Sequence, residues 1–177
     1  MKADKQKQSN REGVEVAAKL RTRLLFLDFD GVLHPTVADP DFPHFCWLPI
    51  LAAQVLPHPS VVIVVHSTWR YDHTNHELSV LLGALAPHFA GSAPRGPRAE
   101  VIGLVLQANK DRVLDHIVLD DDIKAFEGSS LNVLRTDPQK GLSSVVTQAA
   151  LNKWLGGPEA ERASTRPDMH SSNHLNK

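Results

Sequence analysis

The chain has little of several features that would assign it at once to a class. Its single cysteine, Cys46, allows neither an internal disulfide nor a cysteine-rich zinc site. No apolar run approaches the ~20 residues of a membrane-spanning helix, and residues 1–13 lack the hydrophobic core of a signal peptide. Nineteen basic and twenty acidic side chains leave a formal charge of -1, which indicates no nucleic acid or anionic membrane as a partner. These absences predict a cytoplasmic protein that binds no membrane.

What the chain does have is an ordinary globular composition. It contains 177 residues, 42% of them hydrophobic and 22% charged, which suits one domain with a core of its own. The polar, aperiodic start predicts a flexible tail over residues 1–21, with a short helical turn at 14–20. A polar end broken by proline and glycine predicts a disordered tail over residues 156–177. We therefore expect a single domain over residues 22–155.

The most informative stretch is an apolar run at residues 24–27 that ends in two carboxylates. An apolar run bounded by turn signals predicts a buried strand. Only one residue separates Asp28 and Asp30. In a continuing strand both side chains would point to the same face, which the preceding apolar residues bury in the core. The chain is therefore expected to leave strand geometry here, and Gly31 supplies the conformational freedom to do so. Ligands of open α/β sheets bind beyond the carboxyl ends of strands, which makes this a candidate site.

Two later segments repeat this arrangement of an apolar strand running into polar residues. The β-branched run at 61–65 leads into Ser67, and the apolar run at 116–119 leads into Asp120 and Asp121. A further short strand is predicted at 131–134, and an edge strand between residues 89 and 97. Helices are predicted at 46–56, 77–85, 98–109 and 143–155, the second stopped by Pro87 and the last capped by Ser143.

The alternation of strands and helices predicts an α/β fold, a Rossmann-like three-layer sandwich with a central parallel sheet. The carboxyl ends of its strands share one edge, so residues far apart in sequence meet there. Clustered carboxylates repel one another unless one is protonated or a cation lies between them, and an oxygen-rich site suits Mg²⁺. A serine hydroxyl and a guanidinium nearby would bind phosphoryl oxygens. The predicted set, which indicates phosphoryl transfer, comprises Asp28, Asp30, Ser67, Asp120 and Asp121.

These residues resemble the haloacid dehalogenase (HAD) superfamily of aspartate-nucleophile phosphatases. The segment 28–33 looks like its first motif, Ser67 like its second, and Asp120-Asp121 like its acidic fourth. For the basic third motif, Arg98 has the expected place at the start of the helix before the acidic strand. Lys110 is the usual residue type but lies at the other end of that helix, and Arg95 is a further candidate.

A narrower resemblance is to the small bacterial HAD domains related to those in RNA-repair proteins. It rests on Ser67-Thr68-Trp69-Arg70, on residues 119–122 and on Gly141-Leu142. The family's large caps are inserted after the first motif or between the second and third. Here those intervals hold only a proline-rich loop with a short helix, and one helix with a loop, so we expect no large cap domain and an open site.

The resemblance implies a role for each matching residue. Asp28 would attack phosphorus and form an aspartyl-phosphate, and Asp30 would act first as acid and then as base. Asp28, the backbone carbonyl of Asp30, and Asp121 would bind Mg²⁺, with Asp120 as a direct or supporting ligand. Ser67 and Arg98 would hold the phosphoryl group. Three further candidates for phosphate binding are Thr68, Arg70 and Lys110.

The leading interpretation is a Mg²⁺-dependent phosphomonoesterase acting on a small-molecule or macromolecular phosphate. Three alternatives remain: a polynucleotide end-processing phosphatase, a phosphoacceptor signalling domain, and a catalytically weak binding module with the same fold. Trp69 is expected in the core or the site wall, and Arg70 either in a surface ion pair or on the substrate. His34 and His66 lie beside the site and either tune it or pack. The sequence predicts no oligomeric state.

Overall fold

A parallel five-stranded sheet forms the centre of the molecule. The computed structural model describes residues 21–157, and within them the strand order is β3-β2-β1-β4-β5. Every pairing is parallel, so the sheet agrees with the predicted α/β class. The strand that leads into Asp28 is the central one, flanked by the strands that precede Ser67 and Asp121. The strands are β1 (Thr22–Leu27), β2 (Val61–Val65), β3 (Phe89–Ser92), β4 (Val113–Asp120) and β5 (Val133–Arg135).

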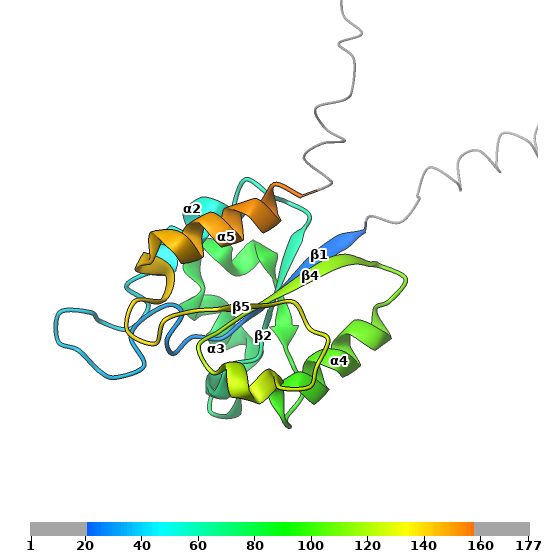
Figure 1. Ribbon diagram of the computed structural model, residues 1–177, viewed down its shortest axis with the longest axis horizontal. Coiled ribbons are helices and arrows are strands. Elements are labelled where there is room, and N and C mark those ends of the chain that lie inside the picture. Colours follow the sequence, from blue (N-terminus) through cyan, green and yellow to red (C-terminus); the bar gives the residue numbers. More distant parts are fainter. Residues whose placement is uncertain (1–20, 158–177) are drawn as a thin grey trace, which may run out of the picture.

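Helices cover both faces of this sheet, as the three-layer prediction requires. In Figure 1, α2 and α5 lie together on one side of the strands and α4 lies on the other. The α-helices are α2 (Leu48–Val55), α3 (Asn75–Leu81), α4 (Arg98–Ala108) and α5 (Val145–Leu155). The 3₁₀ helices are η1 (Thr68–Tyr71), η2 (Gly83–His88), η3 (Ile123–Phe126) and η4 (Gly141–Ser143).

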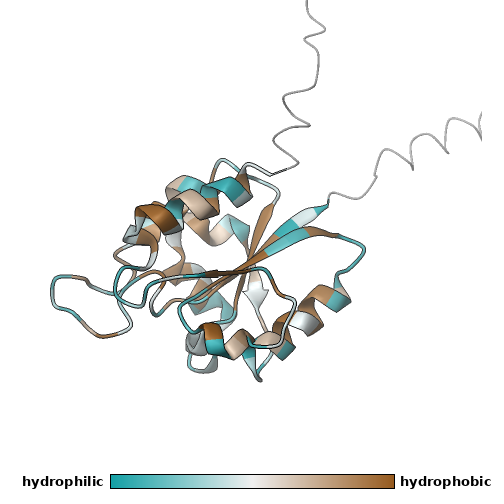
Figure 2. Cartoon of the chain, viewed as in Figure 1, coloured by the Kyte–Doolittle hydropathy of each residue, from teal (hydrophilic) through white to brown (hydrophobic). Residues whose placement is uncertain are grey.

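Strand alternation divides the core into two clusters. Leu25 and Leu27 of β1 face the layer of α2, α3 and α5, whereas Leu24 and Phe26 face α4 and η3. Figure 2 shows the strands as mainly hydrophobic and the outer helices as mixed. The central strand is therefore buried on both faces, which explains why its sequence is continuously apolar rather than alternating.

Several predicted helix boundaries are wrong by one to four residues, as at the start of the helix predicted at 46–56, which begins at Leu48. The helix predicted at 77–85 runs over Asn75–Leu81, and a 3₁₀ helix that contains Pro87 follows, although Leu82 and Leu85 still enter the core. Gly83 has φ +52°, a left-handed conformation that favours glycine and ends the α-helix. The cap of α5 is Ser144, whose hydroxyl accepts from the Thr147 N–H.

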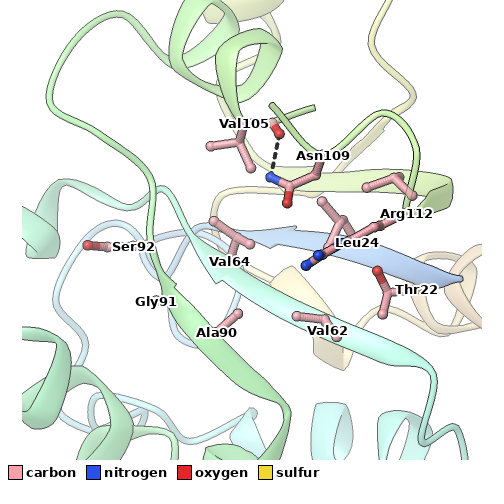
Figure 3. A pocket seen from close by; sticks show the side chains of 11 residues that line it. Thr22, Leu24, Val62, Val64, Ala90, Gly91, Ser92, Val105, Asn109 and Arg112 are labelled. Atoms are coloured by element: carbon pink, nitrogen blue, oxygen red, sulfur yellow. Dashed lines mark hydrogen bonds between the residues drawn. The ribbon is translucent and has the colours of Figure 1, made fainter. Parts of the chain in front are cut away.

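The α4 face of the sheet is only partly covered. A groove of about 710 Å³ opens there, lined by Leu24, Val62 and Val64 from the strands and by Val105 and Arg112. Figure 3 shows these side chains with the hydrogen bond from Asn109 to the Val105 carbonyl above them. The groove is a feature of the sheet face and is separate from the carboxylates at the strand ends.

No large cap domain lies between the strands of the described chain. The interval from β1 to β2 holds a loop and α2, and the interval from β2 to β3 holds η1, α3 and η2. No helix among residues 21–157 is both long and apolar enough to cross a membrane. The predicted tails lie almost wholly outside the described residues.

Candidate active site

The site begins where β1 ends. Asp28 is fully buried; its N–H donates to the Leu119 carbonyl (3.1 Å), and its Oδ1 accepts from the Phe29 N–H (2.7 Å). The chain then turns at Gly31, which has φ +67° and donates its N–H to the His34 carbonyl (2.9 Å). This turn is the departure from strand geometry that the sequence predicts, and it places Asp28 at the carboxyl edge of the sheet.

Three carboxylates meet at this edge. Asp28 from β1, and Asp120 and Asp121 from the end of β4, offer oxygen atoms that all lie within 4.8 Å of one another. Burial raises the pKa of Asp28, and Arg98 and the Ser67 hydroxyl oppose that rise only in part. Burial and the neighbouring Asp28 raise the pKa of Asp120 to about 7. This cluster therefore contains more buried negative charge than its protein partners compensate.

Arg98 supplies the nearest positive charge. It is the first residue of α4, and its Nη2 lies 3.0 Å from Asp28 Oδ2. Its Nη1 donates to both oxygens of Asp120, at 2.8 and 3.0 Å. The guanidinium thus contacts two of the three carboxylates. Lys110 follows the opposite end of α4, away from the carboxylates.

The carboxylate of Asp30 turns away from the other three. Its Oδ1 lies 3.1 Å from His34 Nε2, and its Oδ2 accepts from Trp69 Nε1 at 3.1 Å. The side chain is 37% exposed, whereas the His34 side chain is 2% exposed. The metal ligand predicted from Asp30 is its backbone carbonyl. Its carboxylate, which lies outside the cluster, can therefore have another role.

The sequence of this domain matches a known family. Residues 24–146 match the family model described as the HAD domain in Swiss Army Knife RNA repair proteins. The chain belongs to this HAD family. No curated protein and no solved structure matches it.

The second motif of the HAD domain follows β2. Ser67 is buried, contributes to the pKa of Asp28 through its hydroxyl, and caps η1 by accepting from the Trp69 N–H (3.4 Å). Thr68 begins η1 and is exposed. Of these two hydroxyl residues, Ser67 is the one that faces the aspartate.

Arg70 has neither of the roles considered for it from the sequence. It is buried, with its Nη1 donating to the carbonyls of His66 and Ser67, the latter at 2.8 Å. Its Nε and Nη2 donate to the carbonyls of Pro94 and Gly96, each at 3.3 Å. Arg70 therefore joins the end of β2 to the loop that leads into α4. Its guanidinium is occupied by backbone carbonyls, which is the physical reason against a phosphate-binding role.

Three further residues of the HAD domain contact the carboxylates or the turn beside them, and of these the sequence predicted only His66 to lie beside the site. The Thr36 hydroxyl donates to Asp121 Oδ2 (2.8 Å), and the buried Thr136 hydroxyl donates to the Gly31 carbonyl (2.7 Å). His66 Nδ1 lies 3.6 Å from Asp120 Oδ2, and burial lowers the pKa of His66 to about 3. His66 directly follows the end of β2, whereas Thr36 and Thr136 carry no comparable signal in the sequence.

Proposed function

We propose that this HAD domain is a Mg²⁺-dependent phosphomonoester hydrolase that works through an aspartyl-phosphate on Asp28. The observation that carries the proposal is the division of labour between two nearby acids. Asp28 lies in the carboxylate cluster beside Arg98, whereas the Asp30 carboxylate lies outside it and contacts two ring nitrogens. A nucleophile and a separate proton carrier are what two-step phosphoryl transfer requires.

The donor set of the cluster fits a magnesium ion. Carboxylate and carbonyl oxygens are the ligands that hard divalent cations prefer, and Mg²⁺ typically uses one or two carboxylates together with water and substrate phosphate. Asp28, Asp121 and the Asp30 carbonyl would hold the ion, with Asp120 in support. When bound, the ion would neutralise the buried carboxylates and the phosphoryl oxygens.

The protein's own residues would carry out the bond changes in two steps. A carboxylate oxygen of Asp28 attacks phosphorus, the bond from phosphorus to the leaving oxygen breaks, and Asp30 gives that oxygen its proton. Water then attacks the phosphorus, Asp30 takes a proton from it, and the bond from phosphorus to Asp28 breaks to release phosphate. Ser67 and Arg98 orient the phosphoryl group and balance its charge during both steps.

A screen of phosphate esters with Mg²⁺ tests this function. The substrates are p-nitrophenyl phosphate, nucleotides, sugar phosphates, phosphopeptides and phosphorylated oligonucleotides. Asp28→Asn should lower turnover about 10³-fold or more, whereas Asp41→Asn, an exposed acid of the loop after β1, should not. Asp30→Asn should accumulate phosphoenzyme with p-nitrophenyl phosphate, because its good leaving group permits the first step while the second lacks its base. Absence of turnover with every substrate would contradict the proposal.

A second candidate is a phosphatase that acts on the ends of RNA. The matched family is described by its RNA-repair proteins, and no large cap domain lies between the described strands. Binding of an oligonucleotide 3′- or 5′-phosphate should then weaken as salt is added, because phosphate contacts release counterions. Affinity that is independent of salt would argue against RNA as the substrate.

A further inference from the structure

Each carboxylate oxygen of Asp30 faces a ring nitrogen of its own. His34 Nε2 lies 3.1 Å from Oδ1, and Trp69 Nε1 lies 3.1 Å from Oδ2. His34 belongs to the turn after β1, and Trp69 belongs to η1, immediately after the second motif. Two separate segments therefore converge on one carboxylate.

A backbone contact fixes His34 as a donor. The Phe45 N–H donates to His34 Nδ1 at 3.3 Å, so Nδ1 is an acceptor and the ring proton of the neutral tautomer lies on Nε2. Burial also lowers the pKa of His34, which favours this neutral ring. His34 and Trp69 thus present two N–H donors to Asp30 without adding a positive charge beside the carboxylate cluster.

Ring packing holds the two donors in place. Phe45 makes edge contacts with Phe29 and Trp69, with ring centroids 5.1 and 5.2 Å apart. Phe29 and Trp69 also meet edge to face at 5.8 Å, and His73 stacks on Trp69 at 5.3 Å. Trp69 is thereby contacted from several sides, and the His34 ring packs against Phe45 with ring centroids 5.4 Å apart. Such packing restricts rotamers, so each N–H points at a fixed position.

We propose that His34 and Trp69 are positioning residues that hold Asp30 as the proton carrier of the reaction. This inference rests on the proposed phosphatase function. Asp30 lies two residues from Asp28. Without these donors its carboxylate could rotate toward the Mg²⁺ ion proposed for the carboxylate cluster. A carboxylate bound to a cation is a poor proton carrier. The two N–H groups keep Asp30 outside the cluster and stabilise the negative charge that develops on it as its proton moves to the leaving oxygen.

The dependence of rate on the leaving group tests this role. An alkyl phosphate such as glycerol phosphate needs a proton on its leaving oxygen, whereas p-nitrophenyl phosphate does not. Trp69→Phe and His34→Phe should each lower kcat for the alkyl ester about tenfold or more. The rate of the first step with the aryl ester, measured as the burst of p-nitrophenolate, should change less than about threefold, and Mg²⁺ affinity should not fall. His34→Gln retains an N–H donor and should recover most of the alkyl activity.

The matched control is a second tryptophan–aspartate pair away from the carboxylates. Trp154 Nε1 donates to Asp115 Oδ2 at 2.7 Å, so Trp154→Phe removes the same kind of bond without touching Asp30. It should leave the ratio of alkyl to aryl turnover unchanged. In an Asp30→Asn background, Trp69→Phe should cause no further loss, because the residue it positions is already absent.

The outcomes separate this inference from the function on which it rests. Equal losses in the first-step rate on both esters, or full additivity of Trp69→Phe with Asp30→Asn, would overturn the positioning role while the phosphatase function stands. A loss with His34→Gln as large as with His34→Phe would do the same for His34. A wild-type protein that hydrolyses neither ester would overturn both proposals together.

Discussion

At the scale of single residues, Gly31 leaves no room for a side chain beside the carboxylate cluster. It has φ +67°, and a Cβ atom added to it would lie 2.5 Å from the carboxyl carbon and Oδ2 of Asp121. A side chain there would therefore meet both backbone strain and a clash with a predicted metal ligand. The glycine of the first motif is required because a second strand end approaches it closely.

Gly31→Ala is expected to lower both stability and affinity for Mg²⁺. The strained φ angle and the displaced Asp121 should together cost about 1–3 kcal/mol of unfolding free energy. Thermal denaturation and calorimetric titration with Mg²⁺ measure the two effects. Gly103→Ala in α4 is the control, because a Cβ atom at Gly103 would meet open space and alanine is preferred within a helix. Equal behaviour of the two variants would contradict the crowding argument.

The carboxylate cluster also predicts how stability changes with pH. The pKa of Asp120 is raised from 3.8 to about 7 in the folded protein. Its contribution to stability is therefore complete below pH 3.8 and is lost as pH rises through 7. The pKa of His66 is lowered from 6.5 to about 3, so its contribution is present above pH 6.5 and is lost on acidification. The two effects oppose each other from about pH 4 to pH 7, because half of the unfolded His66 is still protonated at pH 6.5.

Relative to an Asp120→Asn variant, the Mg²⁺-free protein should accordingly lose stability between pH 6.5 and pH 8, and this comparison cancels the titration of the histidines in both proteins. The expected relative loss is about 1 kcal/mol, or roughly 2–4 °C. Added Mg²⁺ should restore stability more at pH 8, because a cation replaces the proton that the cluster has lost. Equal changes of melting temperature in the two proteins between pH 6.5 and pH 8 without Mg²⁺ would show that the cluster is not protonated as described.

At the scale of secondary-structure elements, the apolar runs predicted which segments form strands and helices better than where they end. The helix predicted at 77–85 follows a real line of buried leucines, but backbone geometry changes at Gly83 while burial continues. Hydrophobic spacing reports burial, and both an α-helix and a 3₁₀ helix can provide it. Ser143 and Ser144 are equally good caps by residue type, and only the position of η4 decides between them.

Arg70 is the main connection between two elements of the site, and removing it should loosen both. Arg70→Met removes the guanidinium donor from four buried or partly buried carbonyls. Two of these carbonyls lie at the end of β2, and two lie in the loop that leads into α4. We expect a loss of about 2–3 kcal/mol in urea denaturation. We also expect a higher KM for phosphate esters, since the loop that positions Arg98 is no longer held. The control is Arg95→Met, because Arg95 is exposed and donates to one carbonyl, that of Tyr71. It should cost less than about 0.5 kcal/mol, and a similar loss in both variants would contradict this explanation.

At the scale of the whole molecule, parallel topology made much of the site predictable. Strands that run in one direction end at one edge, so Asp28, Ser67 and Asp121 could be expected together from the sequence alone. The partners of these residues could not. Thr36 reaches Asp121 across 85 positions of the chain, and Trp69 reaches Asp30 across 39. Such contacts depend on loop paths and rotamers, for which a single sequence carries no periodic signal.

The contacts between the two ends of the described range predict that residues 21–157 fold independently. Buried Arg23, near the amino end of the central strand, donates to the Leu155 carbonyl (2.9 Å) and lies over the Trp154 ring. The first strand and the last helix are thus tied together inside the described range.

A fragment of residues 21–157 should therefore melt within about 2 °C of the full chain and keep its Mg²⁺-dependent turnover. A larger drop in melting temperature would mean that a flanking segment covers apolar surface of the domain. The groove beside Val62 and Val64 would be the first place to look, since β1 begins at its edge with Thr22. Substituting Val62 with aspartate would then destabilise the full chain more than the fragment, whereas equal effects in both would leave the groove open to solvent in each.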